Sequence, residues 1–161
     1  MTASPRLAIR FFAGRTPFGY AYEPLWLAAL ALGPGDALVT LHESDIREYT
    51  TDRTPAQRVV LRLSDEAAAG LLGVRDKLHE VPILVSLDGA PLYAAVEYPV
   101  FGAAALKRPV VHLGELAQST VTIAAVQGAA HGDLASAEEA RRIDHPELRA
   151  MFAARGALTA R

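Results

Sequence analysis

The sequence contains no cysteine, and this absence removes several kinds of chemistry. Disulfide bonds, thiolate metal sites and a cysteine nucleophile are all excluded. The absence says nothing about the cellular compartment, because a chain without cysteine tolerates oxidising and reducing conditions alike. Familiar catalytic and nucleotide-binding motifs are missing as well: the chain has no GxxxxGK[ST] loop, no GxGxxG fingerprint and no GxSxG elbow.

Concentrated positive charge is also missing. The 161 residues include 16 basic and 18 acidic side chains, which gives a formal net charge of −2. Only two of the basic residues are lysines, Lys77 and Lys107. Because no run of basic residues forms a phosphate-binding stripe, we expect no nucleic-acid partner.

The chain has no long apolar run. Its longest one, residues 24–32, falls far short of the ~20 residues that a membrane-spanning helix needs, so we expect no membrane span. The apolar stretch within residues 1–12 is too short for a signal peptide and is interrupted by Arg10. We therefore expect a soluble, cytoplasmic protein, and a periplasmic one only if translation starts upstream of Met1.

The residues that are present favour a compact fold. Hydrophobic residues make up 51% of the chain, too many for intrinsic disorder, and the length suits one domain. We expect a single α+β domain over residues 1–161, with its core in residues 6–128 and a helical C-terminal segment in residues 136–157.

The apolar pattern predicts a succession of strands. Strands are expected at residues 6–13, 37–42, 58–63, 83–87, 91–98, 109–113 and 119–126. Residues 43–57 are polar and are expected to form a loop or a ragged edge strand. The dipeptide Asp88-Gly89 between two strands predicts a hairpin turn.

Helices are predicted between and after these strands. The first covers residues 24–32, and the second runs from an N-cap at Ser64 to about Leu78. Ser136 and Glu139 have the spacing of a capping box, and a last helix opens at Pro146 and stops at Gly156. This order predicts an α+β fold whose mixed or mostly antiparallel sheet has helices packed on one face. Apolar residues surround the first helix, which we therefore expect to be mostly buried: Leu25, Trp26, Leu27 and Leu30.

Short motifs follow one another in the middle of the chain. A strand ending Leu61-Arg62-Leu63-Ser64 precedes the acidic helix start Asp65-Glu66; a strand ending Leu87-Asp88-Gly89 then precedes the return strand Pro91-Leu92-Tyr93. This order, within residues 38–112, resembles the first periplasmic (head) domain of the SecD/SecDF protein-export proteins. The resemblance implies a sheet-and-helix module that contacts other polypeptides and has no catalytic residues. The chain lacks counterparts of the family's transmembrane helices, so no translocation motor is implied.

Aromatic side chains are the first candidates for binding a partner, because exposed aromatic residues often anchor protein interfaces. Tyr20 and Tyr22 share a face if that stretch is extended, and Tyr98 and Phe101 come where the return strand ends. Core packing explains most of the other aromatic residues. The predicted partner-binding residues are Phe18, Tyr20, Tyr22, Tyr98 and Phe101.

Histidines near acidic residues offer an alternative. His131, Asp133 and His145 could supply nitrogen and oxygen ligands to a metal ion. No HExxH or comparable spacing accompanies them, and aspartates also suit turns and helix starts. We therefore expect no metal and no cofactor, and keep these three residues as the alternative.

We expect a non-catalytic protein-binding or assembly module. Its partner is another protein or a second copy of the chain, because an exposed apolar sheet surface or edge needs covering. The alternative is a small hydrolase or metal-assisted enzyme that uses histidine and aspartate residues from loops. That alternative predicts a polar pocket joining His42, His112 or His131 to a carboxylate. A small-molecule sensor pocket beneath the helix at residues 24–32 is a third hypothesis.

Overall fold

The computed structural model describes residues 4–14, 19, 21–102, 104, 106–131 and 134–160, without the side chains of residues 130 and 131. This part of the chain forms a nine-stranded sheet and four α-helices. The strands are β1 (Leu7–Phe12), β2 (Ala37–Leu41), β3 (Ile46–Thr51), β4 (Arg58–Leu63), β5 (Pro82–Leu87), β6 (Ala90–Glu97), β7 (Val110–His112), β8 (Thr120–Ala124) and β9 (Leu158–Ala160). The α-helices are α1 (Tyr22–Leu30), α2 (Asp65–Leu72), α3 (Ala137–Ile143) and α4 (Pro146–Ala154).

The sheet is mixed. Its strand order is β2-β1-β5-β6-β7-β8-β4-β3-β9. The pairs β6–β7 and β3–β9 are parallel, and the other neighbours are antiparallel. The predicted α+β class with a mixed, mostly antiparallel sheet is therefore confirmed.

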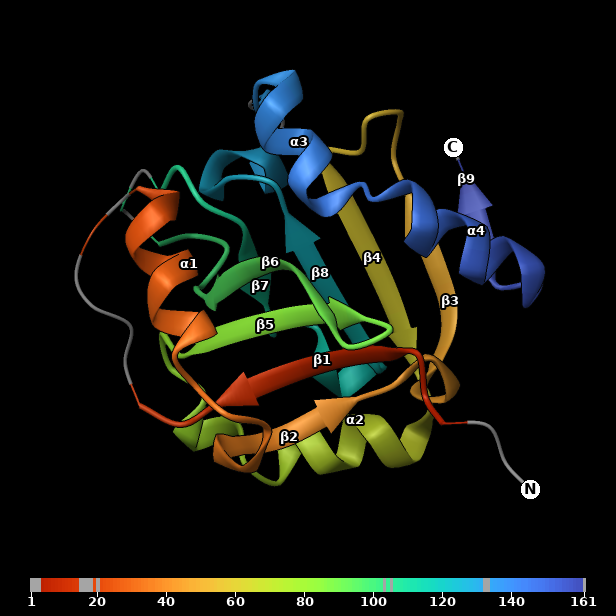
Figure 1. The fold of residues 1–161 in the computed structure, drawn as a ribbon, viewed down its shortest axis with the longest axis horizontal. Helices are drawn as coiled ribbons and strands as arrows, with labels where there is room; N and C mark the ends of the chain where they lie inside the picture. The colour runs from red at the N-terminus through yellow and green to blue at the C-terminus, as the bar shows by residue number, and fades with distance from the viewer. Residues whose placement is uncertain are drawn as a thin grey trace.

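A short connection forces this sheet to curl. β2 ends at Leu41 and β3 begins at Ile46, yet the two strands are seven positions apart in the strand order. In a flat sheet that separation would be roughly 34 Å, because neighbouring strands lie about 4.8 Å apart. Five residues span at most about 18 Å. Figure 1 shows the outcome: β1, β5 and β6 run across the view, and β8, β4 and β3 cross them at a steep angle.

The helices are distributed around the curled sheet. α1 contacts β5 and β6, α2 contacts β2 and β4, α3 contacts β6, and α4 contacts β9. In Figure 1 they lie on different sides of the molecule, α1 at the left, α2 below, α3 above and α4 at the right. The expected packing of all helices on one face is not confirmed. None of the helices in the described ranges is long and apolar enough to cross a membrane.

Local sequence signals place many element boundaries. The Ser64 hydroxyl accepts a hydrogen bond from the Ala67 amide at 3.2 Å and caps α2, as predicted. Ser136 and Glu139 form the predicted capping box, with backbone-to-side-chain distances of 2.9 and 3.1 Å. The Asp88-Gly89 hairpin joins β5 to β6, and both of its residues have positive φ, 51° and 81°. Such short-range hydrogen bonds and turns depend on neighbouring residues alone, so the sequence predicts them.

Three expectations need correction. Residues 46–51 form a regular strand paired on both sides, with β4 and β9, rather than a loop or an edge strand. A register shift between Ile46 and Glu48 interrupts the alternation of this strand and hides it in the sequence. α2 ends at Leu72, with Gly73 as its C-cap, instead of continuing to Leu78. The C-terminal tail also forms a strand, β9, which was not predicted from its three residues.

Candidate functional site

The predicted aromatic residues divide into several environments. Phe18 and Tyr20 lie outside the described residues. Tyr22 is half-buried, its ring stacks on Trp26 with a centroid distance of 6.1 Å, and its hydroxyl accepts a hydrogen bond from the Ala94 amide at 3.2 Å. The guanidinium of Arg142 lies 4.1 Å from the Tyr22 ring centroid, and burial raises the pKa of the Tyr22 hydroxyl. Tyr22 therefore helps to fasten α1 and α3 to β6.

Tyr98 and Phe101 occupy one loop but differ in exposure. The Tyr98 ring lies directly on Gly102, where a Cβ atom would come within 1.9 Å of a ring carbon, so only glycine fits there. The Tyr98 hydroxyl accepts a hydrogen bond from the Ala104 amide at 3.0 Å, which shapes the loop. Phe101 is 89% exposed. Among the predicted aromatic residues that the structure describes, Tyr22 and Tyr98 are half-buried, and Phe101 has its side chain largely in solvent.

Two of the histidines proposed for an enzyme are held by backbone carbonyls. The Nδ1 atom of His42 lies 2.8 Å from the Leu7 carbonyl oxygen, and that of His112 lies 2.6 Å from the Tyr98 carbonyl oxygen. These contacts are typical of histidines that fix backbone geometry.

The alternative metal residues are only partly described. The side chain of His131 and the whole of Asp133 lie outside the described residues. His145 is the N-cap residue of α4, and its Nδ1 atom is buried without a hydrogen-bond partner. Within the ranges that the structure covers, no three histidine, aspartate or glutamate side chains group together as metal ligands would.

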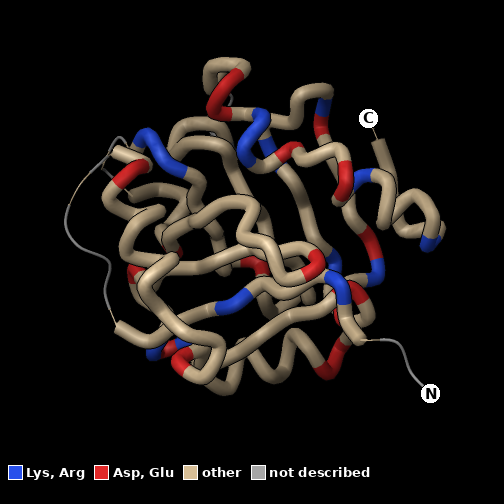
Figure 2. Tube along the Cα trace, in the orientation of Figure 1, with Lys and Arg blue, Asp and Glu red and all other residues tan. Residues whose placement is uncertain are grey.

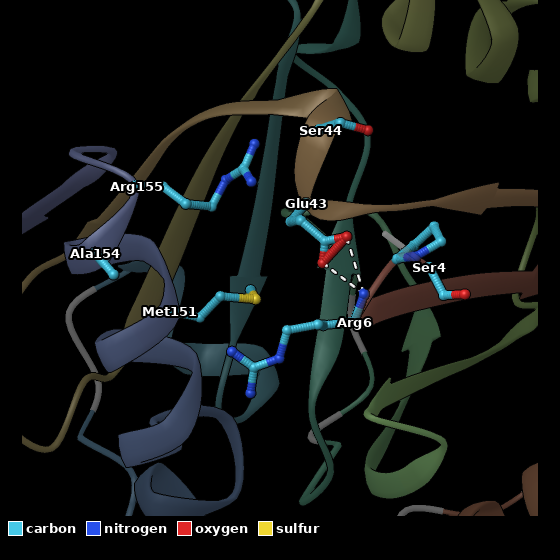
Figure 3. A pocket seen from close by; sticks show the side chains of 8 residues that line it. Ser4, Arg6, Glu43, Ser44, Met151, Ala154 and Arg155 are labelled. Carbon is cyan, nitrogen blue, oxygen red and sulfur yellow. Dashed lines mark hydrogen bonds between the residues drawn. The ribbon is translucent and has the colours of Figure 1, made fainter. Parts of the chain in front are cut away.

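A pocket of about 640 Å³ opens between the start of β1, the turn after β2 and α4. Figure 3 shows Arg6, Met151 and Arg155 pointing toward the space beside Glu43. Ser4 and Ser44 contribute hydroxyls at its edge.

The acidic residue of this pocket is engaged by the backbone. The buried Glu43 carboxylate accepts hydrogen bonds from the Arg6 amide at 2.9 and 3.0 Å and from the Leu7 amide at 2.8 Å. Its oxygens therefore fix the start of β1 against the turn that follows β2. Arg6 directs its own guanidinium to Asp88. Histidine is not among the described residues that line the pocket.

A buried ion pair lies at the junction of α3 and α4. The Asp144 carboxylate accepts hydrogen bonds from the Nε and Nη2 atoms of Arg149. Its Oδ2 atom also accepts a hydrogen bond from the Ala56 amide at 2.7 Å. Arg149 in turn donates to the Arg53 carbonyl at 3.0 Å. Next to them the rings of Tyr49 and Phe152 stack at 4.5 Å, and burial raises the pKa of the Tyr49 hydroxyl. This cluster joins the C-terminal helices to the β3–β4 connection, which indicates a structural role.

The clearest apolar surface belongs to α1. Leu25 and Ala29 are fully buried on one side of the helix, whereas Leu27 is 58% and Leu30 is 42% exposed. The last two residues are three positions apart and therefore share a face, which we call the leucine face. The expectation that α1 is mostly buried is wrong for this face. The sequence of this helix is apolar on every side. It therefore predicted burial, but it could not show which side would remain exposed to solvent.

One polar residue was missed by the sequence reasoning. Arg108 is 2% exposed, and its Nε and Nη2 atoms have no hydrogen-bond partner in the described structure. Burial lowers the pKa of its guanidinium. A single arginine before Pro109 in a loop carries no motif, so no sequence signal marks it.

No protein-family model matches the chain, and neither a curated protein nor a solved structure matches it significantly.

Proposed function

We propose that this protein is a non-catalytic assembly module that binds a second copy of itself through the leucine face of α1. The exposure of Leu27 and Leu30 carries this proposal, because apolar side chains gathered on one helix face gain free energy when a partner removes them from water. The similarity of residues 38–112 to the SecD head domain, a module that contacts polypeptides, is in line with this function and stays a prediction.

A second copy suits this face better than a charged partner does. Glu23, Leu27 and Leu30 are spaced four and three positions apart and therefore lie along one side of α1. Glu23 is the charged residue of these three. If two α1 helices pair antiparallel across a twofold axis, the leucines of the two copies meet. The two Glu23 carboxylates then lie at opposite ends of the pair, so they do not repel one another strongly.

The polar groups support a binding role over a hydrolytic one. The Glu43 carboxylate in the large pocket is held by backbone amides, and His42 and His112 are held by backbone carbonyls. Figure 2 shows acidic and basic residues interspersed along the trace, which favours an apolar rather than an electrostatic attachment.

The oligomeric state tests this proposal directly. Light scattering coupled to size exclusion is expected to show a dimer that dissociates on dilution. The double substitution Leu27→Glu with Leu30→Glu should give a monomer that melts at the temperature of the diluted, dissociated wild type, because both side chains are exposed in the monomer. Leu72→Glu is the matched control: Leu72 is 48% exposed on α2, outside the leucine face, so this variant should still dimerise. A wild-type protein that stays monomeric at high concentration, or a double variant that still dimerises, would contradict the proposal.

A further inference from the structure

We propose that Arg108 and the first turn of α1 bind an oxyanion, a carboxylate or phosphate group that presents two adjacent negatively charged oxygens. This site lies at the N-terminal end of α1. It uses none of the residues of the leucine face, so either proposal can fail without the other.

The first observation is a buried charge without a counter-charge. Arg108 is 2% exposed, its Nε and Nη2 atoms lack a hydrogen-bond partner, and no carboxylate forms an ion pair with it in the described part of the chain. A guanidinium removed from water costs substantial free energy unless an anion and hydrogen-bond acceptors replace the water. Buried polar groups are nearly always hydrogen-bonded in folded proteins, so this one calls for a partner.

Two other arginines of the same protein show what that partner looks like. Arg6 donates from Nε and Nη2 to the two carboxylate oxygens of Asp88, both at 2.9 Å. Arg149 uses the same two nitrogens on the two oxygens of Asp144. The buried, unsatisfied donors of Arg108 are this same pair. Such paired donors match a group with two adjacent oxygens, as carboxylates and phosphates have.

The second observation is the position of Arg108 at the start of α1. Lys107 forms a parallel β-bridge with Ala21, the N-cap residue of the helix. A Cβ atom on Gly19 would lie 3.2 Å from the Arg108 Nη2 atom. The Arg108 Nη2 atom therefore lies close to the backbone two residues before the N-cap, where a side chain at position 19 would crowd it.

This helix end is itself suited to an anion. Ala21, the N-cap residue, makes no side-chain hydrogen bond, so the amides of residues 22 and 23 lack the usual cap. The third residue of the helix, Pro24, has no N–H to offer. The two amides and the helix dipole give the end a partial positive charge, which attracts oxyanions. The exposed Lys107 adds a further positive charge, and Glu23 in the first turn is an exposed opposing one.

Titration with two small probes tests the site. Inorganic phosphate and acetate are added separately to the purified full chain, with sodium chloride at equal ionic strength as the reference, and binding is followed by calorimetry or by backbone chemical shifts. Saturable binding of at least one probe, with shifts at residues 19, 21–23 and 108, is expected. Phosphate binding alone identifies a phosphate-type ligand, and acetate binding alone identifies a carboxylate. If chloride reproduces every effect of both probes, the proposal is wrong.

Arg108→Met keeps the length of the side chain but removes both donors. We expect it to weaken binding of the probe by about tenfold or more, because two charge-assisted hydrogen bonds are lost. Arg47→Met is the matched control, since Arg47 is an exposed arginine on β3, and it should leave the affinity within about twofold. Equal affinities of the wild type and Arg108→Met would overturn the proposal.

The melting temperature gives a second readout without added ligand. Because Arg108 is buried without a partner, Arg108→Met should melt at a higher temperature than the wild type in chloride alone. A lower melting temperature would mean that the guanidinium is already satisfied, which contradicts the premise. If Arg108→Met does not fold, Arg108→Lys keeps the charge but loses the paired donors. It should still bind the probe several-fold more weakly than the wild type, and an unchanged affinity would exclude the site.

Discussion

The six residues of β5 are all buried, whereas β4, also inside the sheet, has its buried residues at every second position. β1, β5 and β6 form a half of the sheet that is largely buried on both faces, and α1 packs on β5 and β6. β3, β4 and β8 form the other half, in which one face joins the core and the other is partly exposed. Continuous apolar runs mark the first half in the sequence, and alternation marks the second.

The difference between the halves shows where a partner can still add burial. In the half with β3, β4 and β8, the second face carries polar residues that water satisfies, among them Thr50, Arg62 and Thr120. In the half with β1, β5 and β6, the cover is α1, whose own outer side is apolar. In this half the exposed apolar side chains therefore belong to α1 and not to the sheet. For this reason we place the proposed interface on α1.

Truncations on β5 should have the largest effects. Ile83 and Leu84 are neighbours with side chains on opposite faces, and they are 0% and 6% exposed. Ile83→Ala and Leu84→Ala should each lower the free energy of unfolding by about 2–5 kcal/mol, because each leaves a cavity. Denaturant titration measures both. A small effect for one of the pair would mean that one face of this half is not packed.

The next effect concerns the attachment of α4 to the other half. Asp144→Asn should lower the free energy of unfolding by about 3 kcal/mol, because it leaves the partly buried Arg149 charge without its carboxylate. Asp88→Asn is the control: Asp88 holds Arg6 through the same two nitrogens, but both side chains are about half exposed, so the loss should be much smaller. Equal losses in the two variants would show that burial of the pair does not matter.

A matched pair of substitutions on β4 tests its one-sided burial. Val59 is 0% exposed and Val60, on the opposite face, is half-buried. Val59→Thr should cost about 1–3 kcal/mol, because it buries a hydroxyl. Val60→Thr should change the stability by no more than about 0.5 kcal/mol. If both substitutions cost the same, the second face of β4 must be covered in solution, for instance by a partner.

The smallest effect is a pH dependence in the doubly buried half. Burial raises the pKa of Glu97 at the end of β6, and the hydrogen bond from the Glu80 amide only partly opposes this effect. The unfolded chain therefore ionises first as the pH rises. The contribution of Glu97 to stability is therefore greatest below the ordinary glutamate pKa and falls as the pH rises from that value through the raised one.

Glu97→Gln should remove this loss. Thermal unfolding is expected to show the variant more stable than the wild type at pH 7 and equal to it at low pH. Glu48→Gln is the control, because Glu48 on β3 is partly exposed, and its Oε2 atom lies 3.7 Å from the Nη1 atom of the exposed Arg62. A Glu97→Gln variant that is less stable at pH 7 would show that the ionised carboxylate is favourable where it lies.

Much of the fold could be predicted because its signals are local. The caps at Ser64 and Ser136, the Asp88-Gly89 turn and the apolar strands β4, β5 and β6 each depend on residues a few positions apart. β3 was harder, because its register shift breaks the alternation, and β9 was missed because three residues carry too little pattern. The end of α2 at Leu72 was misplaced, since apolar residues recur beyond it although the helix does not continue.

The surroundings of the candidate residues depend on tertiary packing, which the sequence does not show. Whether Leu27 meets the core or water depends on how α1 lies on β5 and β6, and the sequence of α1 is apolar on every side. Tyr22 and Tyr98 were proposed as interface residues; in the structure the Tyr22 hydroxyl is hydrogen-bonded to β6 and the Tyr98 hydroxyl to its own loop. Aromatic residues serve cores and interfaces equally well, so their type alone does not separate the two roles.

By itself, the sequence determined the α+β class, most strands, the helix caps and the lack of cysteine chemistry, because these follow from composition, periodicity and neighbouring residues. The tertiary structure alone decided the curl of the sheet, the exposure of the leucine face and the isolation of Arg108. Arg6 pairs with Asp88, 82 positions away in the sequence, whereas Arg108 meets no such partner among the described residues; both outcomes depend on which distant segments meet. Burial and charge pairing depend on those meetings, and no local pattern encodes them.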